Sequence, residues 1–589
     1  MGVAVRDAEA VGAGLVRLRR IAAADPARPQ IWRQFGDALD AAGDRAGSAK
    51  AYLEHVRQAQ ADPALMRAAA ALHDNDIPVA ERLLKTHLKQ APTDVVAIRM
   101  LAELAARLDR SEDATHLLER CLELAPGFAE ARLNYAVVLH RSNHPAAALE
   151  QLDLLLRDDA ANPGSLNLKA AVLCRVGEYE NAIGIYAALT RDYPHQAQFW
   201  LSYGHALKTA GHGERAIEAY RRAIAANADF GDAYWSLANL KTFRFGEDDI
   251  DAMRRALARD DLAAEHRLHF EFALGKALED RKEYAESFAH YSHGNALRLT
   301  QVPYNADETT RRFAHARQLY TREFFLARAR AGCAAPDPIF IVGLPRSGST
   351  LLEQILASHS QIEGTMELPE IISLTRTLRR AGASGRPGAY HDALAHLAHA
   401  ELRELGEQYL ARTRLQRKLG RPFFIDKMPN NFAHVGLIHL VLPNAKIIDA
   451  RRHPLACCFS NFKQHFARGQ SFSYSLEDIG RYYRDYAELM AHFDVVLPGR
   501  VHRVIHENLI DDTEREVRRL LDYCGLPFEE GVLRFFENDR PVRTASSEQV
   551  RQPINRTGVD QWRHYEPWLG PLEAALGTAL QSWNKVQVA

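Results

Sequence analysis

Apolar positions in the first half of the chain recur with a period of thirty-four residues. Small residues mark the start of each period, at Ala68, Ala102, Ala136, Ala170, Gly204 and Ala238. A second small residue follows twelve positions later, at Ala80, Ala114, Ala148, Ala182 and Ala216. A larger residue follows four positions beyond that, at Leu84, Leu118, Leu152, Tyr186 and Tyr220. Because closely crossing helices need small residues and the gaps between them need large ones, the pattern predicts a series of packed helix pairs.

This spacing resembles the tetratricopeptide repeat (TPR), whose helix pairs stack into an all-α solenoid. We expect about seven repeats over residues 1–300, starting near Trp32 and ending in degenerate repeats near Tyr291. A helical linker over 301–335 should follow, with a helix from Asp307 to Arg330. The resemblance implies a concave surface that binds a protein or peptide acceptor. The alternative is that the array only spaces the chain or joins it into a homodimer.

The second half opens with a different pattern, an apolar strand that runs into a glycine-bounded loop. Ile339 to Val342 are typical of a buried parallel strand, and the apolar positions from Leu351 onwards predict a helix after the loop. The backbone N–H groups of Ser347 to Thr350 would lie at the start of that helix, where free donors attract phosphate. Ser349 stands where nucleotide triphosphatases have their phosphate-binding lysine, so ATP with Mg²⁺ is a poor fit.

The loop 344–350 resembles the 5′-phosphosulfate loop of sulfotransferases, whose donor is 3′-phosphoadenosine 5′-phosphosulfate (PAPS). The resemblance implies that the donor is bound by Arg346, Ser347, Gly348, Ser349 and Thr350. A second apolar strand begins at Lys446 and ends in basic residues, and Ser460 follows Arg452 by eight positions. Sulfotransferases bind the 3′-phosphate with such an Arg and Ser pair. The resemblance therefore implies an α/β, P-loop-like sulfotransferase domain with a parallel sheet over residues 336–589.

Three further features resemble the tyrosylprotein sulfotransferases in particular. Glu367 lies twenty-one residues after Arg346, where that family has its catalytic base. Lys427 takes the place of a lysine that contacts the transferred sulfuryl group. The segment 546–555 resembles the one that wraps the nucleotide, through Ser546, Gln549, Val550, Pro553 and Asn555. The resemblance thus implies a PAPS-dependent enzyme with Arg346, Glu367, Lys427 and Ser546 as its catalytic residues.

The chemistry of sulfuryl transfer is consistent with these residue types. In an in-line displacement, negative charge gathers on the bridging oxygen of the leaving phosphate, by analogy with phosphoryl transfer. Arg346 and Lys427 are cations that could meet this charge, and Ser546 could donate a hydrogen bond to the sulfate oxygens. Glu367 could take the proton of the acceptor hydroxyl. Since the transferred group carries less charge than a phosphoryl group and no carboxylate cluster accompanies the loop, we expect no metal.

Several positions depart from the tyrosylprotein sulfotransferase pattern. Gln561 replaces a lysine, although Arg556 and Arg563 lie near it in sequence, and His506 replaces a tyrosine. Residues 368–370 lack the arginine that helps to hold an acidic peptide in the animal enzymes. A protein tyrosine is the expected acceptor. The alternatives are sulfation of a carbohydrate, lipid or small-molecule hydroxyl, and a TPR scaffold whose nucleotide-binding domain is inactive.

Composition limits the partners and the compartment. The net charge of −1 over 589 residues gives no field that would favour nucleic acid or a membrane surface. The six cysteines form no spaced framework, which favours a reducing compartment. No run of eighteen apolar residues occurs, and the N-terminus has no long apolar core. We therefore expect a cytoplasmic protein that binds neither nucleic acid nor membrane.

Overall fold

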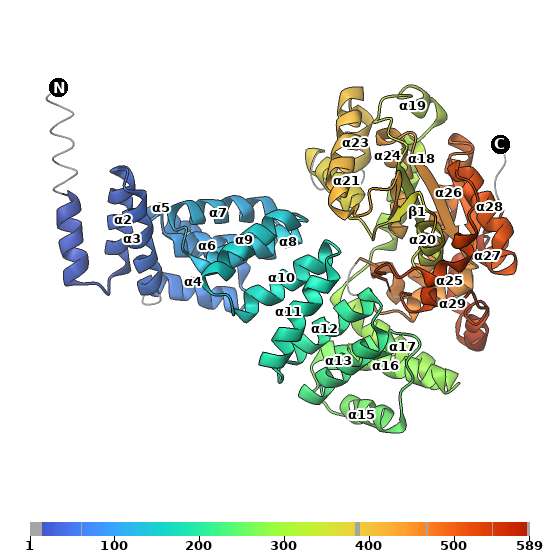
Figure 1. The fold of residues 1–589 in the computed structure, drawn as a ribbon, viewed down its shortest axis with the longest axis horizontal. Helices are drawn as coiled ribbons and strands as arrows, with labels where there is room; N and C mark the ends of the chain where they lie inside the picture. The colour runs from blue at the N-terminus through green and yellow to red at the C-terminus, as the bar shows by residue number, and fades with distance from the viewer. Residues whose placement is uncertain (1–13, 60–61, 383–388, 467–468, 545, 586–589) are drawn as a thin grey trace. The chain divides into compact units, whose positions relative to one another are not determined.

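The computed structural model describes residues 14–59, 62–382, 389–466, 469–544 and 546–585 (Figure 1). Internal contacts divide the chain into two compact units, Met1–Ile185 and Tyr186–Ala589. The division falls within helix α11 (Tyr179–Asp192). The second unit therefore contains repeat helices as well as the whole sheet. The domain limits near 300 and 336, which follow from the sequence pattern, stay a prediction.

The first unit consists of antiparallel helix pairs, as the period predicts. Its helices include α2 (Pro29–Ala41), α3 (Arg45–Gln58), α4 (Pro63–His73), α5 (Ile77–Gln90), α6 (Val95–Arg107), α7 (Ser111–Leu124), α8 (Ala129–Arg141), α9 (Pro145–Asp158) and α10 (Pro163–Arg175). Aspartates start four of them: the carboxylates of Asp44, Asp62, Asp76 and Asp94 accept hydrogen bonds from N–H groups of the first turn. Proline at the first or second position of several helices adds to these start signals.

The small residues of the period lie where helices cross. Ala80 and Ala114 are completely buried, and Ala68 and Ala102 are nearly so. At Gly36 an added Cβ would lie 3.1 Å from the ring of Tyr52, sixteen residues later on the partner helix. The reason for the repeat pattern is thus close packing of each helix against its partner.

Repeat helices continue into the second unit. They are α12 (Ala197–Ala210), α13 (Gly213–Ala226), α14 (Gly231–Ala238), α15 (Glu247–Leu257), α16 (Ala264–Asp280) and α17 (Tyr284–Gln301). The Gly36 arrangement recurs twice here. An added Cβ would lie 2.4 Å from the Tyr220 ring at Gly204, and 2.9 Å from the Tyr291 ring at Gly275. The degenerate last repeat expected near Tyr291 therefore keeps the packing of the others.

The single helix expected from Asp307 to Arg330 is two helices in the structure, α18 (Ala306–Leu319) and α19 (Arg322–Leu326). Thr321 has an extended backbone conformation, and its side chain accepts a hydrogen bond from the N–H of Phe324 at 3.1 Å. That contact starts a new helix and ends the old one. The expectation was wrong because a threonine cap interrupts a helix-favouring composition.

The sheet has five parallel strands in the order β2-β3-β1-β4-β5. They are β1 (Pro338–Gly343), β2 (Ile362–Gly364), β3 (Phe423–Lys427), β4 (Lys446–Arg451) and β5 (Val501–Ile505). Ile339 of β1 pairs with Ile425 on one side and with Lys446 on the other. Strands β2 and β3 lie on one side of the central strand β1, and β4 and β5 lie on the other. Ligands of open α/β sheets bind where the strand order reverses in this way, beyond the carboxyl ends of the strands.

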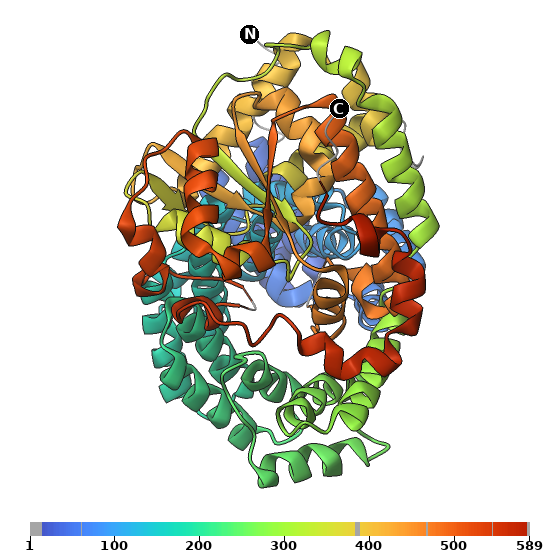
Figure 2. The ribbon, with the colours of Figure 1, turned by 90° about the vertical axis from the view of Figure 1, so that its right-hand side faces the viewer.

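Both faces of the sheet are covered. Alternate residues of β1 point to opposite sides, and each set lies in a different hydrophobic core. Ile339 and Ile341 belong to a core that includes residues of α20 (Ser349–Ala357) and α28 (Thr513–Cys524). Phe340 and Val342 belong to a second core, shared with α26 (Leu476–Val496) and with the repeat helices α14, α16 and α17. Figure 2 shows the strands between these layers. Part of the repeat region and the sheet thus share one hydrophobic core.

The remaining helices surround the sheet and its ends. They are α21 (Glu370–Ala381), α22 (Ala389–His396), α23 (His399–Thr413), α24 (Val435–Val441), α25 (Pro454–Phe462), α27 (His506–Asp511), α29 (Gly570–Leu576) and α30 (Ala579–Ser582). Short 3₁₀ segments are η2 (Arg414–Gln416), η3 (Pro429–His434), η4 (Ser471–Tyr474), η5 (Glu530–Glu537), η6 (Gln549–Arg551) and η7 (Gln561–Trp568). None of the helices in the described part of the chain is long and apolar enough to cross a membrane. The cysteines at positions 121, 174, 333, 457, 458 and 524 are all free thiols.

Candidate functional site

The loop between β1 and α20 has the backbone shape of an anion-binding turn. Arg346 has a φ of 67° and Gly348 a φ of 95°, which places both in the left-handed region. At Gly348 an added Cβ would lie 2.6 Å from Nδ1 of His506, so only glycine fits there. Ser349 then begins α20, and the free N–H groups of its first turn border the loop.

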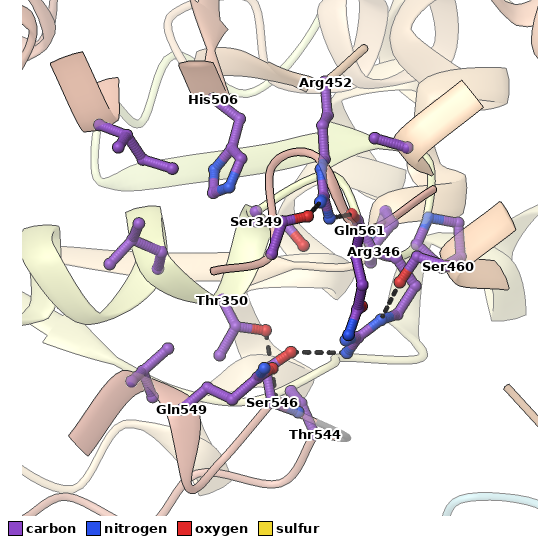
Figure 3. Close-up of a pocket in the computed structure, with 18 of the residues that line it drawn as sticks. Arg346, Ser349, Thr350, Arg452, Ser460, His506, Thr544, Ser546, Gln549 and Gln561 are labelled. Atoms are coloured by element: carbon purple, nitrogen blue, oxygen red, sulfur yellow. Dashed lines mark hydrogen bonds between the residues drawn. The ribbon is translucent and has the colours of Figure 1, made fainter. Parts of the chain in front are cut away.

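Arg346 is the centre of the site. Its Nε donates to Oγ of Ser460 at 3.1 Å, and one terminal nitrogen donates to Oγ of Ser546 at 2.7 Å (Figure 3). The guanidinium of Arg452 donates to the carbonyl oxygen of Arg346 at 3.3 Å and also to that of Gly558. Residues from the loop, from α25, from the end of β4 and from the C-terminal segment therefore meet at one place.

The electrostatics of this place favour an anion. Burial, together with the nearby charge of Arg452, lowers the pKa of Arg346 to about 10. Burial also lowers the pKa of Arg452. Within the described ranges, neither guanidinium forms an ion pair with a carboxylate. Two adjacent, partly buried cations that form no ion pair are costly, and an anionic ligand would relieve that cost.

Lys427 and Glu367 form an ion pair at the carboxyl end of β3. Lys427 ends β3, its side chain is 1% exposed, and Nζ lies 2.6 Å from Oε1 of Glu367. Glu353 lies 3.8 Å from the same Nζ and is also paired with Arg540 at 3.0 Å. The Glu367 side chain is 44% exposed, so its carboxylate is within reach of an incoming hydroxyl. The pair thus combines a buried cation with an accessible carboxylate.

The C-terminal segment forms another wall. Thr350 of α20 donates to Thr544 at 3.3 Å, and η6 begins three residues after Ser546. The site is a cavity of about 350 Å³. Its lining includes all but one of the residues predicted from sequence, namely Arg346, Gly348, Ser349, Thr350, Glu367, Lys427, Arg452, Ser460, Ser546, Gln549, Val550, Pro553 and Asn555. The exception is Ser347, a residue of the loop that is 2% exposed.

Some lining residues were not identified from the sequence. Phe459, Lys463, Thr544 and Trp562 line the same cavity. Lys463 lies three residues after Ser460, so one helical turn separates them, and that spacing could have indicated it. Thr544 and Trp562 flank the predicted nucleotide segment but belong to no motif that sequence alone would reveal.

Unpartnered polar atoms show where a ligand would fit. Nε of Arg452 and Nδ1 of His506 are buried, have no hydrogen-bond partner among the described residues, and belong to residues that line the cavity. Oγ of Ser347 is also unpartnered, but Ser347 does not line the cavity. Burial, and the charges of Arg452 and Arg346, lower the pKa of His506 to about 3, so this imidazole is neutral. These atoms and the left-handed loop are suited to an anionic nucleotide.

One group of side chains has the spacing of a metal site, and it lies outside this cavity. Glu271, His290 and His293, on α16 and α17, have ligand atoms within 4.8 Å of one another. Nδ1 of His290 lies 2.6 Å from the Glu271 carboxylate, so these two side chains already satisfy each other. None of the three lines the loop cavity.

Comparison with known proteins divides the chain in the same way as its sequence pattern. The sulfotransferase family model matches residues 338–530, and tetratricopeptide repeat models match 108–172 and 168–229. An uncharacterised protein of Aquifex aeolicus (strain VF5) is 31% identical over 373 residues, which is 62% of this chain. This chain spans about half of that relative, 48% of its length.

Two other similarities concern the second half of the chain. A putative protein-tyrosine sulfotransferase of Caenorhabditis briggsae is 24% identical over 241 residues, 38% of this chain and 80% of that protein. The sulfotransferase domain of the Synechococcus PCC 7002 olefin synthase is 24% identical, with a TM-score of 0.29, and covers 39% of this chain and 88% of that domain. The family matches confirm the predicted fold class, the tetratricopeptide repeats of the first half and the resemblance of the second half to sulfotransferases. The chain joins a region of tetratricopeptide repeats to a domain of the sulfotransferase family.

Proposed function

We propose that the sulfotransferase-family domain transfers a sulfuryl group from PAPS to an acceptor hydroxyl, and that this acceptor is a protein tyrosine. The observation that carries the proposal is the double contact of Arg346 with Ser460 and Ser546. These contacts bring together three segments that the sequence predicts to bind the nucleotide: the loop that carries Arg346, the helix that carries Ser460 and the C-terminal segment that carries Ser546. The donor would supply the activated sulfuryl group. The residues of this chain would bind the donor, orient the acceptor hydroxyl and take its proton.

Each cation has a separate place in this scheme. Arg452 lies at the carboxyl end of β4, with its Nε unpartnered, and it would bind the 3′-phosphate together with Ser460. Arg346 and Lys427 line the part of the cavity next to the loop. There they would stabilise the charge on the bridging oxygen as the sulfur–oxygen bond breaks. No metal enters this scheme.

Glu367 would act as the general base. As the acceptor oxygen attacks sulfur, its proton would pass to the Glu367 carboxylate, and the leaving nucleotide would keep the electrons of the broken bond. Lys427 holds Oε1 of this carboxylate at 2.6 Å, which fixes its position. The ion pair also keeps the base close to the cation that meets the leaving group.

Tyrosine as the acceptor rests on the residues that resemble tyrosylprotein sulfotransferases and on a relative with that name. The repeat region would recruit the acceptor protein through its concave surface, and the free cysteines favour a reducing, cytoplasmic setting. A carbohydrate, lipid or small-molecule hydroxyl is the second candidate acceptor. An inactive scaffold is disfavoured because the base, both cations and both serines line one cavity.

The test is a comparison of ligands by thermal unfolding. 3′-Phosphoadenosine 5′-phosphate (PAP) should raise the melting temperature of the second unit. At a hundredfold excess over Kd, its binding should raise the free energy of unfolding by about 2.7 kcal/mol. Adenosine 5′-phosphate and ATP with Mg²⁺ should do much less, because neither has a 3′-phosphate for Arg452. Arg452→Gln should abolish the difference between PAP and adenosine 5′-phosphate. The control is Arg500→Gln, because Arg500 precedes the amino end of β5, away from the carboxyl ends of the strands, and does not line the cavity. Equal shifts from all three nucleotides with the wild-type chain would refute the proposal.

A further inference from the structure

A buried carboxylate of the repeat region contacts side chains of the proposed donor cavity. Glu279 lies in the last turn of α16 and is 6% exposed. It accepts hydrogen bonds from Nζ of Lys463 at 2.8 Å and from Nε2 of Gln561 at 2.8 Å. Both of these donors line the cavity. The hydroxyls of Tyr291 and Tyr565 complete its shell at 3.2 and 3.3 Å.

The charges around Glu279 keep it ionised. Burial alone would raise the pKa of this carboxyl, but the charges of Lys463, Lys276 and Lys241 and the hydrogen bond from Lys463 together outweigh burial, so the pKa is lowered. Burial lowers the pKa of Lys463, and Glu279 opposes that effect. Each group therefore stabilises the charged form of the other. Removing one would leave a buried charge without its partner.

Lys463 is the member of this network that can reach an anion. Its ammonium contacts Glu279 and lies 3.1 Å from Oε1 of Gln561, which leaves one N–H. It lies one turn after Ser460, whose hydroxyl contacts Arg346. The charge of Arg346 is close enough to lower the pKa of Lys463. Lys463 is thus held at the side of the cavity where Gln561 replaces a family lysine.

The C-terminal segment that carries Gln561 is itself fastened to the repeat helices. Tyr565 of η7 shares a hydrogen bond of 2.9 Å with Ser287 of α17. The rings of Tyr284 and His564 stack with centroids 4.5 Å apart, and Phe288 stacks on Trp568 at 5.4 Å. Figure 2 shows the red C-terminal segment beside the yellow-green helices of this region. The position of Gln561 therefore depends on α16 and α17.

We propose that Glu279 is a positioning residue of the donor site. It holds Lys463 and Gln561 against the cavity, so the last repeat helices take part in binding the anionic nucleotide. This inference rests on the proposed function, because it takes PAP and PAPS as the ligands. The competing explanation is that Glu279 only joins two packed segments. That explanation predicts an effect on stability and none on nucleotide affinity.

The experiment measures PAP affinity of the full-length chain by isothermal titration calorimetry at fixed ionic strength. Lys463→Met should weaken binding roughly 10- to 100-fold, the range for loss of a charge-assisted hydrogen bond. Glu279→Gln should weaken it by about 3- to 10-fold, because Lys463 stays but is no longer held. In the double variant the loss should equal that of Lys463→Met alone, since Glu279 acts through Lys463.

A matched control lies on the same helix. Glu271 is also a buried carboxylate of α16, but its partner is His290 and it does not line the cavity. Glu271→Gln should leave PAP affinity unchanged, whatever its effect on the melting temperature.

The results separate this inference from the proposed function. If the wild-type chain binds no PAP, the proposed function fails and this inference fails with it. If the wild-type chain binds PAP but folded Glu279→Gln binds equally well, or the two losses add in the double variant, only the positioning role is overturned. Should Glu279→Gln not fold, unchanged PAP affinity of Lys463→Met overturns the role by itself.

Discussion

The two groups of repeat helices follow the same sequence pattern but are buried in different ways. In the first unit, the core from Tyr52 to Val138 consists of repeat helices, as far as the described residues go. In the second unit, Phe272 and Tyr291 belong to one core with Phe340 of β1 and with helix α26. A repeat period therefore predicts how helices pair, but it does not show which pairs form a separate domain. The last repeat helices share one compact unit and one core with the sheet.

Deletions should separate the two groups most strongly. A chain that begins at residue 186 keeps the shared core and should fold and bind PAP. A chain that begins at residue 331 lacks α14 to α17, would expose the apolar surface around Phe340, and should aggregate or unfold. Circular dichroism, gel filtration and PAP titration of both chains measure this. Normal folding and binding of the shorter chain would show that the repeat helices are dispensable.

A change at the proposed base should affect mainly the chemistry of the second unit. Glu367→Gln keeps the size of the side chain but cannot take a proton, so turnover should fall roughly 10²- to 10⁴-fold. PAP affinity should stay near that of the wild-type chain, and the transition that PAP shifts should fall only modestly, because the amide keeps a hydrogen bond to the buried Lys427 but loses the charge of the carboxylate. Steady-state kinetics with calorimetry checks this. Full turnover by Glu367→Gln would exclude this residue as the base.

The two units should respond in opposite ways to acid near neutral pH. Burial lowers the pKa of His434 and His506 to about 3, so their stabilising effect is present above pH 6.5 and is lost as the pH falls. As the pH falls below 6.5, each of these two histidines lowers the free energy of unfolding by at most about 1.4 kcal/mol per pH unit. In the first unit, the hydrogen bond to Asp94 raises the pKa of His87. Its contribution is present below pH 6.5 and is lost as the pH rises through the raised pKa.

Calorimetric scans between pH 7.5 and pH 5.5 measure the two transitions. The transition that PAP shifts should move to lower temperature in acid, and the other should be less affected or rise. Asp94→Asn should remove the contribution of His87. Parallel downward movement of both transitions, unchanged in Asp94→Asn, would contradict this assignment.

Matched glycine substitutions should produce the smallest effects. An added Cβ would lie 2.9 Å from the Tyr291 ring at Gly275 and 3.1 Å from the Tyr52 ring at Gly36. Overpacking of this kind typically costs about 1–3 kcal/mol. Gly275→Ala should lower the transition that PAP shifts, and Gly36→Ala should lower the other one. Thermal denaturation with and without PAP tests this, and a shift of both transitions by either variant would argue against separate units.

The sequence predicted the local features and left out the long-range ones. Helix pairs, the β1 loop and Lys427 at a strand end follow from short patterns whose causes are local. The contacts of Glu279 with Lys463 and Gln561 join positions 184 and 282 residues apart, and no local pattern indicates them. The break at Thr321 escaped prediction because capping depends on one hydrogen bond. Segments that meet only in the folded chain are thus where sequence analysis stops.

The most direct test of the account is transfer of labelled sulfate. The full-length chain is incubated with PAPS labelled in its sulfate and with a protein extract, and the label is followed into protein, glycan and small molecules. We predict label on protein tyrosine with the wild-type chain, and a large loss of label with Lys427→Met and Glu367→Gln. If label appears only on glycans or small molecules, the enzyme is a sulfotransferase but protein tyrosine is not its acceptor. No transfer to any acceptor, from a chain that is folded and binds PAP, would contradict the assignment of this site as a sulfotransferase.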